Sequence, residues 1–586
     1  MRERPFIKHY PPGVPAEIAQ LQHRTIPDLL RAATEGNENN IAFTQCNWNG
    51  MNGSLRFGQV DHLSDAFAVY LREVVGLEPG DRVAVQLPNC LSYPVVVFGV
   101  LKAGCVLVNT NPLYTPTEMA HQFSDSGARA VVIIDMFADR LTEVLPKTDI
   151  QTVITARVGE FFPPIVAGII RIVQRYWDRS LPPITVPHTR LGTALEEGRH
   201  RLETKEKDQR LAQYIEGVDH DSVAALQYTG GTTGVSKGAT LSHGNLLSNT
   251  EQMLAMAGKH IRPGKEVILT ALPLYHIFAF TVSLLGFYYT GSRNILIPAP
   301  RPPSNLKRAF ENYRVTWLPG VNTLFNALLN ERWFVEHPPR HLFASVAGGM
   351  ALHESVAKRW EEVTGSPVVE GYGLSESSPV LSFNPLGGMV KPGSIGIPVP
   401  STEMRCVDED DNPVDIDEPG EIVARGPQIM LGYWQRPEET EQTLTGGWLH
   451  TGDIGKMDED GYFHIVDRKK DMILVSGFNV YPNEVEEVIA EHPGVKEAAV
   501  IGVPDPASGE IVQAYVVRSN PDLTKEEVIS HCRKSLARYK IPKHVKWRDE
   551  LPKSLIGKIL RKDLRSEILG EEASSGSAAP KSSAAP

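Results

Sequence analysis

The chain has 586 residues, of which 41% are hydrophobic and 22% charged, an ordinary composition for a globular protein. Its net charge of −11 argues against a general nucleic-acid binder, because such proteins present a basic surface. This length predicts several domains. The five cysteines are scattered without a Cys-x-x-Cys pair, so they predict reduced, buried thiols in a cytoplasmic protein.

The N-terminal stretch "MRERPFIKHYPPGVPAEIAQ" carries charge and prolines but no apolar core, so it does not resemble a secretory signal. No apolar run reaches the roughly 18 residues that a membrane span requires. Between residues 81 and 135, short apolar runs alternate with helix-compatible stretches. This alternation predicts βαβ units of a parallel sheet.

The segment 161–180, "FFPPIVAGIIRIVQRYWDRS", begins with a proline pair suited to opening a helix and continues with a wide apolar face. Arg171, Arg175 and Arg179 are spaced by four residues and form a basic stripe beside that face. Such a helix can lie in the headgroup region of a membrane. The alternative is a helix that packs against the core and leaves its arginines in water.

The stretch "YTGGTTGVSKG", residues 228–238, follows an apolar strand-like run and has the composition of an anion-binding loop. It does not fit the P-loop pattern. Lys237 follows a serine, and Gly238 stands where a magnesium-binding hydroxyl is required. If this loop binds a nucleotide, a metal ligand must therefore come from another part of the chain.

Three further motifs follow along the chain. "VVEGYGLSESSP" places Tyr372 and Glu376 on a glycine-rich loop after an apolar strand, and the carboxylate could supply the missing ligand. The block from "GWLHTGD" to "YPNEVE" holds Asp453 and Arg468, suited to ribose hydroxyls and polar oxygens. "LPKSLIGKILRKDL" holds Lys558. Taken singly, each of these three motifs has the alternative interpretation of a solvated surface segment.

In this order, the four motifs resemble the ANL superfamily of adenylate-forming enzymes over roughly residues 20–568. The block from "GWLHTGD" to "YPNEVE", together with "ALPLYHIFAF" and "GVNTLFNALLN", is most similar to bacterial long-chain fatty acyl-CoA synthetases. The resemblance implies an α/β protein with layered sheets and helices. It implies a large N-terminal AMP-binding domain (1–466), a hinge (467–470) and a small mobile α+β C-terminal domain (471–568). The Ser/Ala/Pro-rich tail, 569–586, is expected to be disordered.

The resemblance also implies a reaction. A fatty acid attacks the α-phosphorus of ATP, which gives an acyl-adenylate and pyrophosphate, and the thiol of CoA then displaces AMP. Lys558 matches the lysine that neutralises the α-phosphate and the acyl carboxylate. Thr229 and Glu376 match ligands of Mg²⁺. His276 matches a residue near the carboxylate, although a buried structural histidine is an equal interpretation.

Other positions match the nucleotide and CoA sites of the family. Tyr372 matches the residue stacked on adenine, and Ser375 stands where most relatives have threonine. Lys470 falls at the hinge position, and Gly477 matches a residue of the CoA tunnel. The full set that matches ATP contacts is Thr229, Gly230, Gly231, Thr232, Thr233, Gly234, Lys237, Gly348, Gly349, Tyr372, Ser375, Asp453 and Arg468.

Two other functions stay open on the sequence alone. One is a fatty acyl-AMP ligase that delivers its product to a carrier protein, and the other is a non-catalytic lipid-binding scaffold of the same fold. We expect a cytoplasmic protein, with peripheral contact to the inner membrane through 161–180 and a homodimer as further expectations. The preferred acyl chain length cannot be deduced from the sequence.

Overall fold

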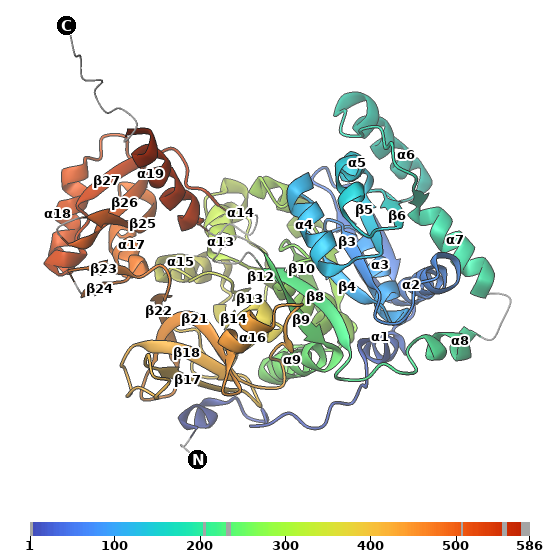
Figure 1. The fold of residues 1–586 in the computed structure, drawn as a ribbon, viewed down its shortest axis with the longest axis horizontal. Helices are drawn as coiled ribbons and strands as arrows, with labels where there is room; N and C mark the ends of the chain where they lie inside the picture. Colours follow the sequence, from blue (N-terminus) through green and yellow to red (C-terminus); the bar gives the residue numbers. More distant parts are fainter. Residues whose placement is uncertain are drawn as a thin grey trace, which may run out of the picture. The chain divides into compact units, whose positions relative to one another are not determined.

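The computed structural model describes residues 4–202, 207–229, 236–476, 478–505, 508–553 and 559–575. Helices and strands alternate along the chain, as Figure 1 shows, which confirms the predicted α/β class. Two compact units are present. The first comprises Met1–Met404, Val423–His450 and Asp460–Tyr462; the second comprises Arg405–Ile422, Thr451–Glu459 and Phe463–Pro586. This division does not test the hinge predicted at 467–470, which stays a prediction.

The first unit contains an eight-stranded sheet in the order β19-β9-β8-β4-β3-β5-β6-β7. Strands β3 to β8 pair in parallel, and β9 returns antiparallel to β8. The strands are β3 (Arg82–Gln86), β4 (Val106–Asn109), β5 (Ala130–Ile134), β6 (Thr152–Ala156), β7 (Thr189–Arg190), β8 (Val223–Thr229), β9 (Lys237–Ser242) and β19 (Gly432–Tyr433). The βαβ units predicted between residues 81 and 135 are confirmed.

Local sequence explains the crossover helices of this sheet. Helix α3 (Ser92–Lys102) is buried along its whole length, as an apolar helix against a parallel sheet should be. Helix α4 (Pro116–Ser126) begins with a capping box between Thr115 and Glu118 and ends at Gly127, whose φ of 61° favours glycine.

A nine-stranded sheet in the order β16-β15-β14-β13-β12-β10-β11-β1-β2 completes the first unit. Its central strands β11 to β14 are parallel. The strands are β1 (Ile41–Cys46), β2 (Asn52–Arg56), β10 (Val267–Thr270), β11 (Arg293–Leu296), β12 (Trp317–Gly320), β13 (Ala344–Ala347), β14 (Val368–Gly373), β15 (Val380–Phe383) and β16 (Ile397–Pro398). Parallel strands present their carboxyl ends at one edge, where ligands usually bind.

Helices flank both sheets of the first unit. The remaining ones are α1 (Ile26–Thr34), α2 (Phe57–Val69), α5 (Leu141–Val144), α6 (Pro164–Ile172), α7 (Leu191–Leu202), α8 (Lys207–Tyr214), α9 (His243–Ala257), α10 (Ile277–Ala279), α11 (Phe287–Tyr289), α12 (Lys307–Asn312), α13 (Asn322–Leu329), α14 (Arg332–Glu336), α15 (Glu354–Thr364) and α16 (Pro437–Thr443). All five cysteines of the chain are free and buried, as the composition predicts.

The second unit is built mainly from antiparallel strands. Strands β17 (Glu403–Val407), β18 (Gly420–Arg425), β21 (Trp448–Met457) and β22 (Phe463–Arg468) are neighbours in one sheet, to which β20 (Leu444–Thr445) also pairs. Of this sheet, residues 405–407, 420–422, 451–457 and 463–468 belong to the second unit. A second sheet contains β23 (Ile473–Val475), β24 (Phe478–Val480), β25 (Val495–Asp505), β26 (Gly509–Arg518) and β27 (His544–Arg548). Its helices are α17 (Pro482–Ala490), α18 (Lys525–Ser535) and α19 (Arg561–Ser575).

The exposure of helix α6 and the π-helical turn η5 (Val173–Trp177) tests whether the segment 161–180 packs against the core. No residue of α6 is buried, and Ile165, Tyr176 and Trp177 are 80%, 71% and 87% exposed. The interpretation of this segment as a core-packing helix is therefore wrong. Figure 1 shows α6 at the margin of the ribbon. Among the described residues, no helix combines the length and hydropathy needed to cross a membrane.

Candidate active site

Gly348 and Gly349 directly follow β13, and Tyr372 lies in β14, the parallel strand beside it. A Cβ on Gly348 would stand 3.1 Å from the Phe278 ring and 3.4 Å from the carbonyl oxygen of Gly371. Gly349 has a φ of 76°, which also favours glycine. The structure therefore brings Gly348 and Gly349 beside the residue that precedes Tyr372, and the close approach explains why glycine is required at 348.

Glu376 lies in the short 3-10 turn η9 (Ser375–Ser377), which packs against β8 and β9. The hydroxyl of Tyr433 donates to its Oε1 at 2.7 Å, and its carbonyl accepts the Met430 N–H at 2.8 Å. Burial and then the Glu376 charge raise the pKa of Tyr433, so the phenol stays a hydrogen-bond donor. The carboxylate is therefore held in a fixed orientation by a neutral group.

The predicted phosphate loop begins and ends in a regular hairpin. Thr229 pairs with Lys237 across β8 and β9. The Lys237 ammonium lies 5.4 Å from the centre of the Tyr433 ring and 3.7 Å from the Glu439 carboxylate. Tyr433 thus contacts both Lys237 and Glu376. Five predicted contacts lie outside the described residues: Gly230, Gly231, Thr232, Thr233 and Gly234.

His276 is the N-cap of α10, where its Nδ1 accepts the Phe278 N–H at 3.4 Å. Burial lowers the pKa of His276 to about 4, so the imidazole is neutral near pH 7. With Nδ1 as acceptor, the hydrogen of the neutral ring resides on Nε2, which can donate. The side chain Nε2 of Gln227 in β8 donates to the Tyr275 carbonyl at 3.0 Å and ties this turn to the sheet.

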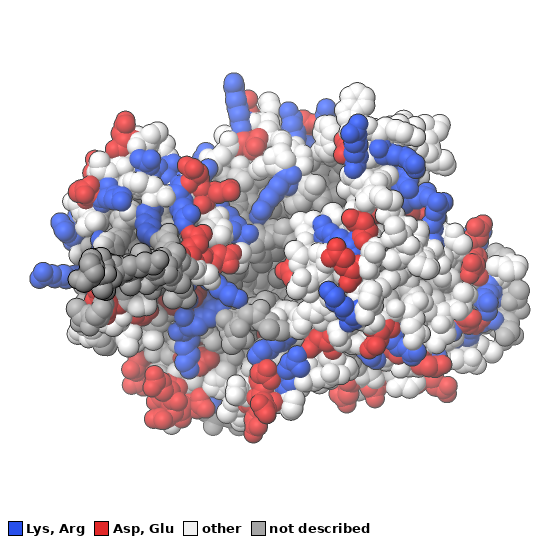
Figure 2. Space-filling view, turned by 45° about the horizontal axis from the view of Figure 1, so that its top comes forward, with Lys and Arg blue, Asp and Glu red and all other residues white. Residues whose placement is uncertain are grey.

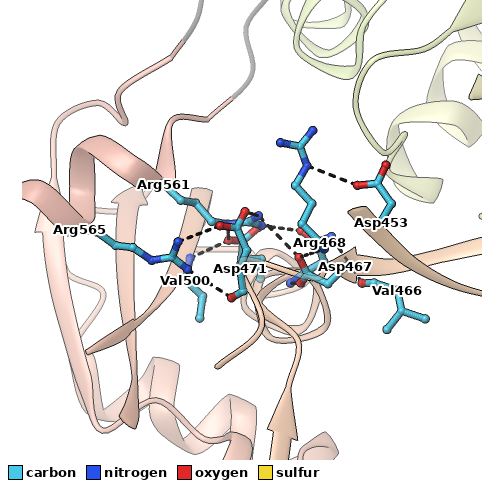
Figure 3. A network of polar contacts seen from close by, with 10 residues as sticks. Asp453, Val466, Asp467, Arg468, Asp471, Val500, Arg561 and Arg565 are labelled. Carbon is cyan, nitrogen blue, oxygen red and sulfur yellow. Dashed lines mark hydrogen bonds and ion pairs between the residues drawn. The ribbon is translucent and has the colours of Figure 1, made fainter. Parts of the chain in front are cut away.

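Asp453 and Arg468 are direct partners across the β21–β22 ladder in the second unit. Their side chains also form an ion pair, with Arg468 Nε 3.6 Å from Asp453 Oδ1, drawn in Figure 3. Lys470, two residues further, is exposed. The structure thus brings together the two residues predicted to contact ribose. Gly477 and Lys558 lie outside the part of the chain that the structure describes.

The structure also reveals residues that sequence reasoning missed. Glu370 in β14 is 8% exposed, and it accepts the Leu352 N–H at 3.0 Å. Burial raises the pKa of Glu370 to about 7. Glu370 therefore connects β14, which contains Tyr372, to Leu352, which lies shortly after Gly348 and Gly349. Its place two residues before Tyr372 was a usable signal, whereas nothing in the sequence marks Tyr433.

One acidic group outside this region resembles a metal site and is not one. Asp61, His62 and Asp65 could together present three ligand atoms. However, the ammonium of Lys102 lies 2.6 Å from Asp61 and 2.7 Å from Asp65. A protein cation already balances these carboxylates, so the group is explained as a partly buried ion-pair cluster.

Comparison with known proteins identifies the class. Residues 30–434 match the family described as AMP-binding enzyme, and residues 484–558 match the AMP-binding enzyme C-terminal domain. The chain therefore belongs to the AMP-binding enzymes, which confirms the resemblance to adenylate-forming proteins. Among solved structures, ATP-bound MatB from Rhodopseudomonas palustris is similar with a TM-score of 0.76 and 28% identity, over 92% of this chain and 98% of that one.

The relatives narrow the class. A long-chain-fatty-acid–CoA ligase of Escherichia coli O157:H7 is 47% identical over 569 residues, covering 97% of this chain and 98% of that protein. A long-chain-fatty-acid–CoA ligase of Bacillus subtilis strain 168 is 36% identical over 571 residues, covering 96% and 98%. The similarity extends over nearly the whole length of both proteins.

Proposed function

We propose that the protein is a ligase that converts long-chain fatty acids to acyl-CoA through an acyl-adenylate, consuming ATP and CoA and releasing AMP and pyrophosphate. The observation that carries this proposal is the 47% identity to a long-chain-fatty-acid–CoA ligase over 97% of the chain. The contacts of Glu376 and Asp453 support it, because they hold two acidic side chains at positions where the family binds ATP.

In the first half-reaction, the chain binds the triphosphate and stabilises the negative charge that spreads over it. Thr229 and Lys237 pair on either side of Gly230 to Gly234, the residues that the family resemblance assigns to the β- and γ-phosphates. Thr229 and Glu376 supply a hydroxyl and a carboxylate, the hard oxygen ligands that suit Mg²⁺. The ion, when bound, neutralises phosphate charge. Tyr433 keeps Glu376 oriented toward that task.

The acyl carboxylate and the α-phosphate meet a different set of groups. Lys558 neutralises both as the new bond forms. His276 donates from Nε2 to a carboxylate oxygen and cannot act as a base, because its neutral ring has its only lone pair committed to Phe278. Gly348, Gly349, Tyr372 and Ser375 form the adenine and α-phosphate contacts.

The second unit serves both half-reactions. Asp453 accepts hydrogen bonds from the ribose hydroxyls, and Arg468 forms an ion pair with it. After adenylation, the C-terminal domain, 471–568, turns about Lys470, within the hinge 467–470. With this turn, the adenylation role of Lys558 ends and the CoA-binding role of Gly477 begins.

The test measures both products in the presence of ATP and a long-chain fatty acid. We expect AMP release that requires the fatty acid, and acyl-CoA whenever free CoA is present. Acyl-adenylate that accumulates while no acyl-CoA forms would replace the proposal with an acyl-AMP ligase that serves a carrier protein. Absence of any AMP release would favour a non-catalytic lipid-binding scaffold.

We further propose that the protein works in the cytoplasm and contacts the inner membrane peripherally through 161–180. The support is an apolar surface beside basic side chains in a chain of net charge −11. Arg171 pairs with Asp135, which is buried, and so anchors the helix, whereas Arg175 lies over the Tyr176 ring. Figure 2 shows lysines and arginines interspersed with acidic residues over the visible face.

The membrane test compares two tryptophans. We expect the wild-type protein to co-sediment with vesicles that contain phosphatidylglycerol, and Trp177→Ser combined with Arg175→Glu to reduce the bound fraction severalfold. Trp48 is 68% exposed elsewhere in the first unit, so Trp48→Ser is the matched control. Equal binding by the two variants would exclude this surface. Light scattering of the same samples tests whether the protein is a homodimer.

A further inference from the structure

Glu421, in strand β18, is a buried carboxylate that the proposed reaction does not use. It is 8% exposed, and each of its two oxygens has a hydrogen-bond partner. Oε1 accepts the backbone N–H of Gly452 at 3.0 Å, and Oε2 accepts from the ammonium of Lys469 at 2.9 Å. Since burial of a carboxylate is costly without such partners, these contacts keep the side chain in one position.

The two partners of Glu421 stand next to the two residues proposed to contact ribose. Gly452 directly precedes Asp453 in β21. Lys469 directly follows Arg468, the last residue of β22. Asp453 and Arg468 face each other at the end of the β21–β22 ladder. The carboxylate of Glu421 therefore bridges the two chain segments beside both proposed ribose contacts.

The ion pair between Asp453 and Arg468 does not by itself fix the direction of the aspartate. Arg468 Nε lies 3.6 Å from Asp453 Oδ1, which is beyond the range of a directional hydrogen bond. The Arg468 side chain is also 36% exposed, and water weakens the attraction of such a pair. Contacts to the backbone beside Asp453 therefore contribute to its orientation.

The backbone just before Asp453 is irregular and is held by contacts from outside β21. Gly452 has a φ of 71° in the middle of the strand, which interrupts the regular pleat. Its N–H donates to Glu421, and its carbonyl accepts the Lys469 N–H at 2.9 Å. The Thr451 hydroxyl accepts the Asp453 N–H at 3.2 Å. Glu421 and Lys469 thus hold both backbone polar groups of the residue that precedes Asp453.

We propose that Glu421 is a positioning residue for ATP, which orients Asp453 toward the ribose hydroxyls by holding Gly452 and Lys469 together. This inference rests on the proposed function, in which Asp453 binds the ribose. Glu421 acts through the backbone of β21 and not on the reacting groups. Its loss therefore weakens the use of a nucleotide that has ribose hydroxyls and spares a nucleotide that lacks them.

The experiment compares ATP with 2′,3′-dideoxy-ATP, which lacks both ribose hydroxyls. Adenylation by the full-length protein is measured as fatty-acid-dependent pyrophosphate release without CoA. The ratio of kcat/KM for ATP to kcat/KM for the dideoxy nucleotide gives the discrimination. The variants are Glu421→Ala, Glu421→Asp and Glu421→Gln. Glu484→Gln is the matched control, because it removes a carboxylate that pairs with Lys540 at 2.7 Å in the same unit.

We expect Glu421→Ala to lower the discrimination at least about fivefold, because the Gly452 N–H loses its acceptor. Glu421→Asp keeps the charge but is one methylene too short to reach both partners, so we expect a loss of about threefold. Circular dichroism shows whether each variant is folded, and Glu421→Asp decides the question if Glu421→Ala is not.

The conservative variant should retain the discrimination. Glu421→Gln keeps the length and the acceptor and loses only an ion pair whose lysine is 53% exposed, so it should stay within about twofold of the wild type. Glu484→Gln should leave the discrimination unchanged. A loss in Glu484→Gln as large as that in Glu421→Asp would show that any lost carboxylate of this unit has the same effect, and would overturn the inference.

A second comparison tests whether Glu421 acts through Asp453. In an Asp453→Ala background the proposed ribose contact is already absent. Adding Glu421→Ala, or Glu421→Asp if Glu421→Ala is unfolded, should then lower the discrimination no further, because the two side chains belong to one unit. A further loss as large as that in the wild-type background would show that Glu421 acts by another route.

Other results separate this inference from the proposed function. Equal slowing with both nucleotides would show a structural role only, and unchanged discrimination at full activity would show no role; both leave the proposed function intact. If the wild-type protein uses the two nucleotides equally well, Asp453 does not bind the ribose hydroxyls, and the inference falls with that assignment. If it releases no pyrophosphate with either nucleotide, the proposed function itself is wrong.

Discussion

The two units hold their functional side chains by different forces. In the first unit, neutral groups orient the key residues: a phenol holds Glu376, and a backbone N–H holds His276. In the second unit, opposite charges do so, as between Asp453 and Arg468 or between Asp467 and Arg561. A neutral contact can be removed with a local effect, whereas removal of one charge leaves its partners unbalanced.

The largest effect that we expect concerns Glu376 in the first unit. Glu376→Gln keeps the oxygen that accepts from Tyr433 but removes the charge proposed to bind Mg²⁺. Adenylation should fall at least about a hundredfold, since electrostatic stabilisation of the phosphates is lost. Pyrophosphate release as a function of Mg²⁺ concentration measures it. A variant with wild-type rate at low Mg²⁺ would show that Glu376 is not a ligand.

A substitution of Asp453 tests the second unit, in which opposite charges hold the functional side chains. Asp453→Asn removes the charge opposite Arg468 and weakens the acceptor for ribose hydroxyls. We expect the KM for ATP to rise about tenfold with a smaller change in kcat, because a charged hydrogen-bond partner is worth about 1.5–3 kcal/mol. If kcat falls while KM is unchanged, Asp453 acts on the reacting groups rather than on ribose binding.

The sequence was sufficient for the fold class and for the partners that share a local segment. Asp453 and Arg468 lie in one continuous block that the sequence singled out, and the structure pairs them across β21 and β22. Likewise, Thr524 and Glu527 have capping-box spacing, and both contacts form at the start of α18. Local spacing determines such contacts, so they can be predicted without tertiary information.

Contacts between distant segments could not be predicted in this way. Tyr433 meets Glu376 only because β19 pairs with β9, beside which η9 packs. Arg561 reaches Asp467 across 94 positions of the chain, which no periodic pattern records. The exposure of α6 was also undetermined, since the apolar face of Ile165 and Trp177 would suit a core equally well. Only packing distinguishes these cases.

Tyr433 provides a smaller test of the neutral contact. Tyr433→Phe removes the hydroxyl that donates to Glu376 and leaves the ring near the Lys237 ammonium. Adenylation should slow about fivefold, in keeping with a net contribution of about 1 kcal/mol for one hydrogen bond. Tyr289 also ends in a hydroxyl, bonded to His23 at 3.0 Å, so Tyr289→Phe is the matched control. Equal effects from the two variants would argue against a specific role.

The smallest effect that we expect is a change of folding stability with pH, and the sign of this change differs between the two units. His243 is 2% exposed, its Nδ1 accepts the Ile26 N–H at 3.1 Å, and burial lowers its pKa to about 4. Between pH 6.5 and 4, the unfolded chain binds a proton at this residue that the folded chain does not. The first unit should therefore lose about 1 kcal/mol of stability between pH 7.5 and 5.5 from His243.

Asp467 and Glu486 act in the opposite direction in the second unit. Their pKa values are raised by burial, so the folded state binds protons more readily than the unfolded state, and acidification through this range does not destabilise the unit through them. Thermal unfolding at pH 7.5 and 5.5 measures the difference, with His243→Asn as the control that keeps an acceptor but cannot titrate. If that variant loses as much stability on acidification as the wild type, the neutral histidine is not the cause, and the contrast between a neutral first unit and an ionic second unit does not extend to stability.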